Sequence, residues 1–221
     1  MPALLTRLQR GLEQLYRIAT GLDVGDFVID AELRAAALDD AVHPRTPREQ
    51  LLLAEDGGGL SVALFVDPGV VAHLERHDPA AALGDHNVGD FLLAVEGVSH
   101  FVYVAWNTGH DKPVTLLELE LQAEVDKYVL GAWLLRQQGE GRFPRELHRA
   151  LFERARVDPV AAAGRISLYH TASSYAARFC RRVAAALERK RFGVTRDLMA
   201  ELRRFYRWGN TRKLRHIERY A

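Results

Sequence analysis

The sequence predicts a mainly helical α+β protein, in which a small N-terminal cap with a β-hairpin precedes a body of several helices. Leucine and alanine, which favour helices, are frequent throughout the chain. Apolar residues recur at three- and four-residue steps over most of the sequence, as they do in amphipathic helices. One short segment instead shows two apolar runs joined by a glycine-rich turn, which is typical of a β-hairpin.

The cap is predicted for residues 1–80. Residues 3–20 carry leucines at helical spacing, and Gly21 is predicted to end this first helix. Too few strands are expected here for an independent domain, so we expect the cap and residues 81–221 to form one compact unit. Within the cap we expect a short strand at 26–30, a hairpin of 49–54 and 60–66 joined at 55–59, and a helix near 69–77.

The body is predicted for residues 81–221 and is expected to be helical throughout. Thr115 and Glu118 have the spacing of a capping box at the start of a long apolar segment. Residues 99–106 and 117–121 also alternate like strands, so β-structure there stays open, although the capping box and the segment lengths favour helices. Helices are predicted at 87–107 and 115–136 and near 144–156, 165–190, 195–208 and 211–220.

The charge of the chain is divided sharply between its two parts. Residues 1–140 hold 10 basic and 22 acidic residues, a net charge of −12, whereas residues 141–221 hold 20 and 7, a net charge of +13. The overall net charge of +1 hides this asymmetry. Only four of the 30 basic residues are lysine, a bias that indicates a GC-rich bacterial genome.

The cysteine content and the apolar segments indicate a cytoplasmic protein without a membrane partner. A single cysteine, Cys180, allows no internal disulfide and suits a reducing compartment. We expect its thiol to be buried, with a reactive thiolate between the flanking arginines as the alternative. The first residues lack the pattern of a signal peptide, and no uninterrupted apolar run reaches the roughly 20 residues of a membrane span.

A polar stripe on the two longest predicted helices is the first candidate site. Glu96 and His100 lie one turn apart on one helix, and Glu120 and Glu124 lie one turn apart on the next. These four residues are candidate ligands of a divalent metal ion, with Lys127 placed to stabilise developing negative charge. The alternative is the solvated edge of two helices, because neither helix carries the Glu-x-x-His pair of di-iron proteins.

Three histidines form a second candidate site. His73 and His77 lie one helical turn apart, and His86 follows within ten residues. Such a pair is half of a zinc site, but the spacing fixes no third ligand. A polar surface helix is the alternative.

The basic C-terminal third is the last candidate site. Arginine suits phosphate and carboxylate groups, and the aromatic residues between the arginines offer stacking faces or core side chains. The alternatives are packing against the acidic part of the chain, a charge-directed homo-oligomer, or a solvated surface. The candidate anion-binding residues are Arg178, Arg182, Arg203, Arg204, Arg207, Arg212, Arg215 and Arg219.

Two functions fit these sites. The first is an adaptor whose basic helices bind an anionic partner, either nucleic acid or an acidic protein surface. The alternative is a metal-assisted hydrolase or nuclease that uses the Glu and His cluster, so the sequence does not decide whether the protein is an enzyme. The chain shows no phosphate-binding glycine loop and no GxSxG motif, which disfavours nucleotide and serine hydrolysis.

Overall fold

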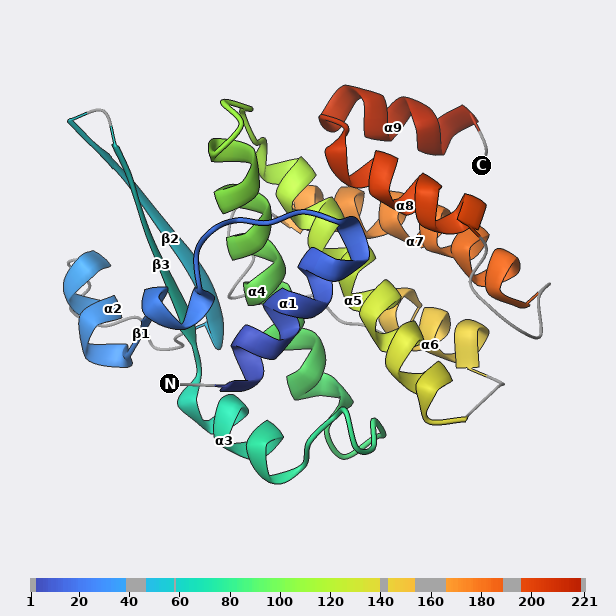
Figure 1. Ribbon diagram of the computed structural model, residues 1–221, viewed down its shortest axis with the longest axis horizontal. Coiled ribbons are helices and arrows are strands. Elements are labelled where there is room, and N and C mark those ends of the chain that lie inside the picture. Colours follow the sequence, from blue (N-terminus) through green and yellow to red (C-terminus); the bar gives the residue numbers. More distant parts are fainter. Residues whose placement is uncertain are drawn as a thin grey trace.

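A computed structural model describes residues 3–38, 47–57, 59–139, 143–153, 166–188 and 196–219. It confirms the predicted fold class, a mainly helical protein with one small sheet (Figure 1). The elements are α1 (Ala3–Tyr16), the 3-10 turn η1 (Val24–Phe27), β1 (Val28–Ile29), α2 (Ala31–Leu38), β2 (Glu49–Asp56), β3 (Gly59–Val66), α3 (Pro68–Arg76), α4 (Val88–Thr108), α5 (Leu116–Gln137), α6 (Phe143–Phe152), α7 (Ile166–Glu188), α8 (Arg196–Arg207) and α9 (Asn210–Arg219).

Helices α4 and α5 form an antiparallel pair at the centre of the molecule. Helices α1 and α3 and the β-hairpin pack on α4, and helices α6 and α7 pack on α5. Of the helices in the described ranges, α4 alone is long and apolar enough to cross a membrane, and 61% of its most apolar window is buried inside the protein. Burial of this extent is typical of the core helix of a globular fold.

The two segments with an ambiguous pattern, 99–106 and 117–121, are both helical. The hydroxyl of Thr115 accepts a hydrogen bond from the backbone N–H of Glu118 at 3.2 Å and so begins α5 as the sequence predicts. The carboxylate of Glu118 instead accepts a hydrogen bond from the hydroxyl of Tyr103 in α4. The predicted capping pattern is therefore also a contact between the two central helices.

The first helix is shorter than predicted. It ends at Tyr16 because Arg17 adopts a left-handed backbone conformation with φ of 52°. The buried Gln9 side chain then fixes the following loop, since it accepts from the N–H of Val24 at 2.7 Å and donates to the carbonyl of Leu22 at 2.6 Å. The sequence analysis also did not anticipate α2.

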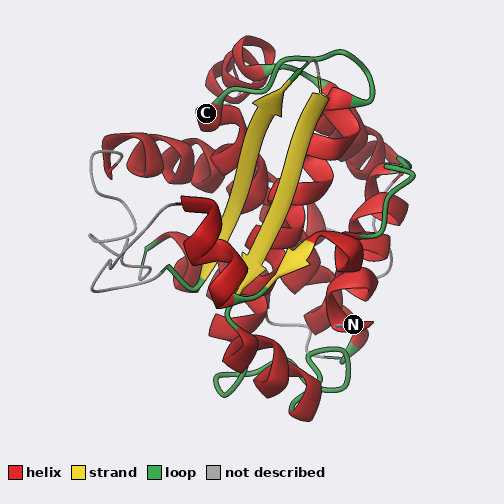
Figure 2. Ribbon diagram, turned by 90° about the vertical axis from the view of Figure 1, so that its left-hand side faces the viewer, coloured by secondary structure: helices red, strands yellow, loops and turns green. Residues whose placement is uncertain are grey.

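The β-hairpin lies across the helical body, as Figure 2 shows. Strands β2 and β3 pair antiparallel, β1 pairs parallel to β3, and the strand order is β1-β3-β2. The first residue of β2, Glu49, lies directly over Gly97 of α4. A Cβ atom at position 97 would lie only 2.8 Å from Glu49 Cγ and 3.2 Å from Leu64 Cδ1. The absence of a side chain at Gly97 therefore lets the hairpin approach α4.

We predict that Gly97→Ala lowers the free energy of unfolding by about 1–3 kcal/mol, because the new methyl group must displace Glu49 and Leu64. The control is Gly89→Ala in the same helix, where an added Cβ meets nothing within 4 Å. Since alanine favours helices, this control should leave stability unchanged or raise it by up to about 1 kcal/mol. Urea unfolding measures both variants, and equal effects would contradict the close approach at Gly97.

Candidate functional site

Polar side chains line both sides of the contact between α4 and α5. One group faces the hairpin and is called the carboxylate–histidine cluster. The other group faces α1 and α9 and is called the buried lysine network. The cluster consists of Glu49, Glu96, His100, Glu120, Glu124 and Lys127, and the network consists of Tyr16, Ser99, Tyr103, Glu118, Gln122, Asp126 and Lys213.

His100 lies at the centre of the cluster, with 7% of its side chain exposed. Its Nδ1 atom lies 3.3 Å from Oε1 of Glu49, which reaches it from β2. Its Nε2 atom lies 3.5 Å from Oε2 of Glu120 but forms no hydrogen bond. A buried polar atom without a hydrogen bond is costly, so it is a candidate for binding a group that the protein alone does not supply.

Glu96 and Glu124 are joined by Lys127. The ammonium Nζ donates to Oε2 of Glu96 and to Oε1 of Glu124, both at 2.8 Å. The side chains of Glu96 and Glu124 remain 29% and 21% exposed, whereas that of Lys127 is 10% exposed. The cluster is thus open to solvent beside these two carboxylates and closed around His100.

The charges of the cluster shift the pKa values of its members. Burial acts to lower the pKa of His100, but Glu49 and Glu120 outweigh it and hold this pKa well above its usual range. Burial likewise acts to lower the pKa of Lys127, and Glu96 and Glu124 reverse the effect, so Lys127 stays charged. The pKa of Glu49 is raised chiefly by its burial.

Three of the four predicted metal ligands are brought together. One potential ligand atom each from Glu96, His100 and Glu120 lies within 4.8 Å of the others. Two ligands on one tetrahedral ion, each at about 2.1 Å, are about 3.4 Å apart, close to the 3.5 Å between His100 Nε2 and Glu120 Oε2. Glu124 does not belong to this group, and its Oε1 atom accepts a hydrogen bond from Lys127.

Glu49 is not among the residues that the sequence predicts for the metal site. Carboxylates that hold the second nitrogen of a metal-bound histidine fix its tautomer and orientation, and Glu49 occupies this position on Nδ1 of His100. The only sequence signal was a glutamate that opens a strand and a glycine inside an apolar helix, two features far apart in the chain.

The three histidines of the second candidate site lie near one another but do not converge on an ion. The rings of His73 and His77 are 4.8 Å apart, and those of His77 and His86 are 5.7 Å apart. His73 Nδ1 is bound by Asp90 at 2.7 Å. Within the part of the chain that the structure describes, only Glu96, His100 and Glu120 form a group of three potential ligand atoms.

The buried lysine network lies on the other side of the α4–α5 contact. Lys213 of α9 is fully buried, and its Nζ donates to the hydroxyl of Tyr103 at 2.8 Å and to Oε1 of Gln122 at 2.7 Å. Gln122 donates to Asp126 at 2.8 Å, and Asp126 also accepts from Ser99 at 2.6 Å. Lys213 therefore reaches its nearest carboxylates only through neutral side chains.

Desolvation controls the charge of this network. Burial lowers the pKa of Lys213 to about 7, although Glu118 and Asp126 act in the opposite direction. Burial raises the pKa of Asp126 to about 6, although its hydrogen bonds act to lower it. Burial thus shifts both groups toward their neutral forms, so that Lys213 loses its proton near neutral pH and Asp126 gains one at a higher pH than an exposed aspartate. Cys180 is also buried, and burial raises the pKa of its thiol, which does not favour a reactive thiolate.

Several of the candidate anion-binding arginines have structural contacts. Arg203 donates to the carbonyl of Leu15 at 3.0 Å and Arg207 to that of Arg17 at 2.8 Å, so both bind backbone at the end of α1 rather than acidic side chains. Arg182 pairs with Glu201 at 2.9 Å. Arg178 and Arg212 lie over the rings of Tyr175 and Trp208, and Arg204, Arg215 and Arg219 are exposed.

The aromatic residues among these arginines belong mainly to the core. Phe205 and Tyr206 are each 1% exposed. Tyr206 stacks on Tyr16 of α1 with ring centroids 4.1 Å apart, and Phe205 stacks on Phe179 of α7 at 4.0 Å. These rings are therefore not available to stack on nucleic-acid bases.

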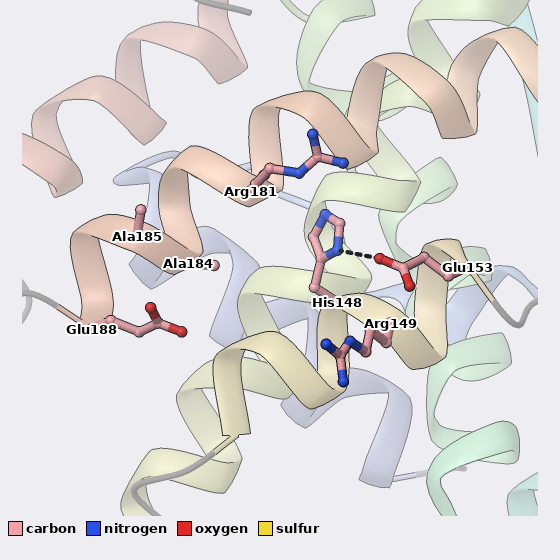
Figure 3. Close-up of a pocket in the computed structure, with 7 residues that line it drawn as sticks. All are labelled: His148, Arg149, Glu153, Arg181, Ala184, Ala185 and Glu188. Atoms are coloured by element: carbon pink, nitrogen blue, oxygen red, sulfur yellow. Dashed lines mark ion pairs between the residues drawn. The ribbon is translucent and has the colours of Figure 1, made fainter.

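A groove between α6 and α7 carries two further arginines that the sequence analysis did not select. Arg149 of α6 and Arg181 of α7 lie on either side of His148 (Figure 3). Nε2 of His148 donates to the carbonyl of Ala177 at 2.8 Å. The acidic side chain of Glu153 also borders the groove, so its charge is mixed.

No protein-family model, no curated protein and no solved structure matches this chain. Function is therefore inferred from the chemistry of the site alone.

We predict that Lys213→Met changes how stability depends on pH. An unfolded lysine has a pKa of about 10.4, so above about pH 7 the unfolded chain binds more protons at this residue than the folded chain does. The contribution of Lys213 to the free energy of unfolding therefore rises with pH. The free energy of the native protein minus that of the variant should grow by on the order of 2 kcal/mol between about pH 7 and about pH 9. Urea unfolding across this range measures it, and a difference independent of pH would contradict a neutral Lys213.

Proposed function

We propose that this protein is a metal-dependent hydrolase whose divalent ion is bound by Glu96, His100 and Glu120. The observation that carries the proposal is the buried Nε2 atom of His100, which has no hydrogen bond and lies 3.5 Å from Glu120 Oε2. In the neutral imidazole, Glu49 on Nδ1 favours the tautomer with a free lone pair on Nε2, and an ion that binds there would take the place of the proton that the raised pKa of His100 keeps on this nitrogen.

The donor set indicates the class of ion. One imidazole and two carboxylates suit Zn²⁺, Mn²⁺ or Fe²⁺ better than Mg²⁺ or Ca²⁺, which prefer oxygen ligands alone. Three protein ligands leave a coordination position open for water, and a bound ion would lower the pKa of that water and so supply the nucleophile of a hydrolysis. Solvent reaches the cluster beside Glu96 and Glu124, where both side chains are partly exposed.

The other members of the cluster have supporting roles in this proposal. Glu49 orients the imidazole of His100, and Lys127 holds the carboxylate of Glu96 in place. The fixed positive charge of Lys127 also lies where it favours negative charge on a substrate.

Metal binding is tested by calorimetric titration of the metal-free protein with Zn²⁺ and Mn²⁺. We expect one ion per chain, loss of measurable binding in His100→Ala, and about 10- to 100-fold weaker binding in Glu49→Gln. The control is His148→Ala, which removes a buried histidine outside the cluster and should keep metal affinity. Unchanged affinity in His100→Ala would refute the assigned ligands.

Hydrolysis is tested separately, with activated carboxylic esters and phosphodiesters as substrates for the metal-loaded protein. We expect turnover that requires the ion and is lost in His100→Ala. Tight metal binding without turnover on either substrate class would leave the ion a structural one and refute the hydrolase assignment.

A second candidate function is binding of an anionic partner by the basic C-terminal third, either nucleic acid or an acidic protein surface. The groove between α6 and α7 favours it, because Arg149 and Arg181 lie on either side of His148 there (Figure 3). Guanidinium groups placed in this way suit phosphate oxygens.

We predict that the Arg149→Gln, Arg181→Gln double variant binds single-stranded RNA more weakly than the native protein. Each lost phosphate contact should reduce the slope of log affinity against log salt by about 0.7, so the double variant should lose about 1.4. The control is Arg7→Gln with Arg48→Gln, two arginines that pair with Asp78 and Asp90. Fluorescence anisotropy at several salt concentrations measures the slopes, and equal slopes would exclude the groove as the binding surface.

A further inference from the structure

The position of Lys127 indicates how many metal ions the cluster can hold. This inference rests on the metal site proposed above. Lys127 bridges two carboxylates of the cluster, Glu96 and Glu124, while His100 lies between the other two. Its Nζ lies 2.8 Å from Glu96 on α4 and 2.8 Å from Glu124 on its own helix. A lysine with 10% of its side chain exposed and two charged hydrogen bonds is held in a fixed place.

Glu96 is shared between Lys127 and the proposed metal site. One oxygen, Oε2, accepts the hydrogen bond from Lys127. The same residue supplies a ligand atom to the group formed with His100 and Glu120. In centres with two metal ions, the ions lie about 3.5–4 Å apart. A carboxylate there can contact both ions, as Glu96 contacts both Lys127 and the proposed metal site. Glu96 is thus placed like a carboxylate that bridges two metal ions, except that the ammonium group of Lys127 stands where one of the two ions would lie.

Glu124 differs from Glu96, because it contacts Lys127 but does not belong to the proposed metal site. It lies one turn after Glu120 and is spaced as a ligand, yet it is absent from the group of three potential ligand atoms. Its Oε1 atom binds Lys127 instead. Glu124 therefore helps to hold the ammonium group of Lys127 and does not contribute to the proposed ion site beside His100.

The balance of charge supports a bound cation as well. Four carboxylates, Glu49, Glu96, Glu120 and Glu124, face one lysine and one histidine. With His100 neutral, as a metal ligand must be, negative charges outnumber the positive charge of Lys127 by three. One divalent ion in addition to Lys127 reduces this excess to one, whereas two divalent ions and Lys127 would reverse its sign.

We propose that the cluster is a centre for one ion, in which the ammonium group of Lys127 permanently occupies the position that a second metal ion would take. Nε2 of His100, which has no hydrogen bond, marks the position for the exchangeable ion, and the hydrogen bonds of Lys127 mark the other position as filled. Lys127 is accordingly a positioning residue that sets metal stoichiometry.

The test measures how many Mn²⁺ ions each folded chain binds. The native protein should bind one ion, and Lys127→Ala, which removes the cation and leaves space between two carboxylates, should bind two. Lys127→Met removes the charge but fills most of the space, so it should bind one. Elemental analysis after gel filtration counts the ions, and electron paramagnetic resonance tells a magnetically coupled pair from isolated ions.

Each outcome decides between the proposals. No ion on the native protein would refute the metal site and this inference together. Two coupled ions on the native protein would keep the metal site and overturn the role of Lys127. One ion on folded Lys127→Ala, or a second ion that is not coupled to the first, would also overturn it.

A second variant covers the case in which Lys127→Ala does not fold. Glu124→Gln removes a partner of Lys127 but no proposed ligand, so it should still bind one ion with affinity within about tenfold of the native value, a change of up to about 1.4 kcal/mol. Glu96→Gln should weaken binding much more, because Glu96 serves both positions. Loss of the ion in Glu124→Gln would show that Glu124 is a ligand and would overturn the inference.

Discussion

Desolvation of charge at the contact between α4 and α5 is the constraint on which the rest of the structure depends. Both helices are covered on most sides by other elements, yet they carry five acidic side chains along their contact. A buried charge without a partner costs several kcal/mol, so each of these groups needs an internal partner. From α1, Tyr16 donates to Asp126 directly, whereas Glu49 of the hairpin and Lys213 of α9 bind His100 and Gln122, the neighbours of these acidic groups.

The two sides of this contact meet the constraint differently. On the side of α9, neutral donors and acceptors separate Lys213 from Asp126, and every polar atom of these two side chains and of Gln122 is hydrogen-bonded. On the side of the hairpin the groups are charged, carboxylates are in excess, and one nitrogen of His100 lacks a hydrogen bond. The hydroxyl of Tyr206, which packs on Tyr16 and Tyr103, also lacks a hydrogen bond, so an unsatisfied atom alone does not separate the two sides. The function is placed on the hairpin side because Nε2 of His100 also lies within a group of potential metal-ligand atoms.

Local patterns predicted much of this fold. The period of apolar residues located the central helices, and the Asp-Gly step located the hairpin, because both signals depend on neighbours close in sequence. The same reasoning placed Glu96 with His100 and Glu120 with Glu124, since helical spacing fixes such pairs. The antiparallel packing of α4 on α5 then brought three of these four residues to one point.

Long-range contacts account for what the sequence did not predict. Glu49 reaches His100 only because the hairpin docks on Gly97, and no local pattern encodes that docking. Lys213 lies among arginines, where a lysine is expected to be solvated, yet its helix turns it inward onto Tyr103. Helical spacing predicts Glu124 as a ligand but cannot show that Lys127 binds it. In each case a partner from another part of the fold decides the role.

The contacts at the end of α1 have a consequence for synthesis of the chain. Tyr16 stacks on Tyr206, and the carbonyls of Leu15 and Arg17 are bound by Arg203 and Arg207. A ribosome adds about 5–20 residues each second, so α1 waits roughly 10–40 s for these partners. During translation, the apolar face of α1 therefore has only part of its final packing until α8 emerges.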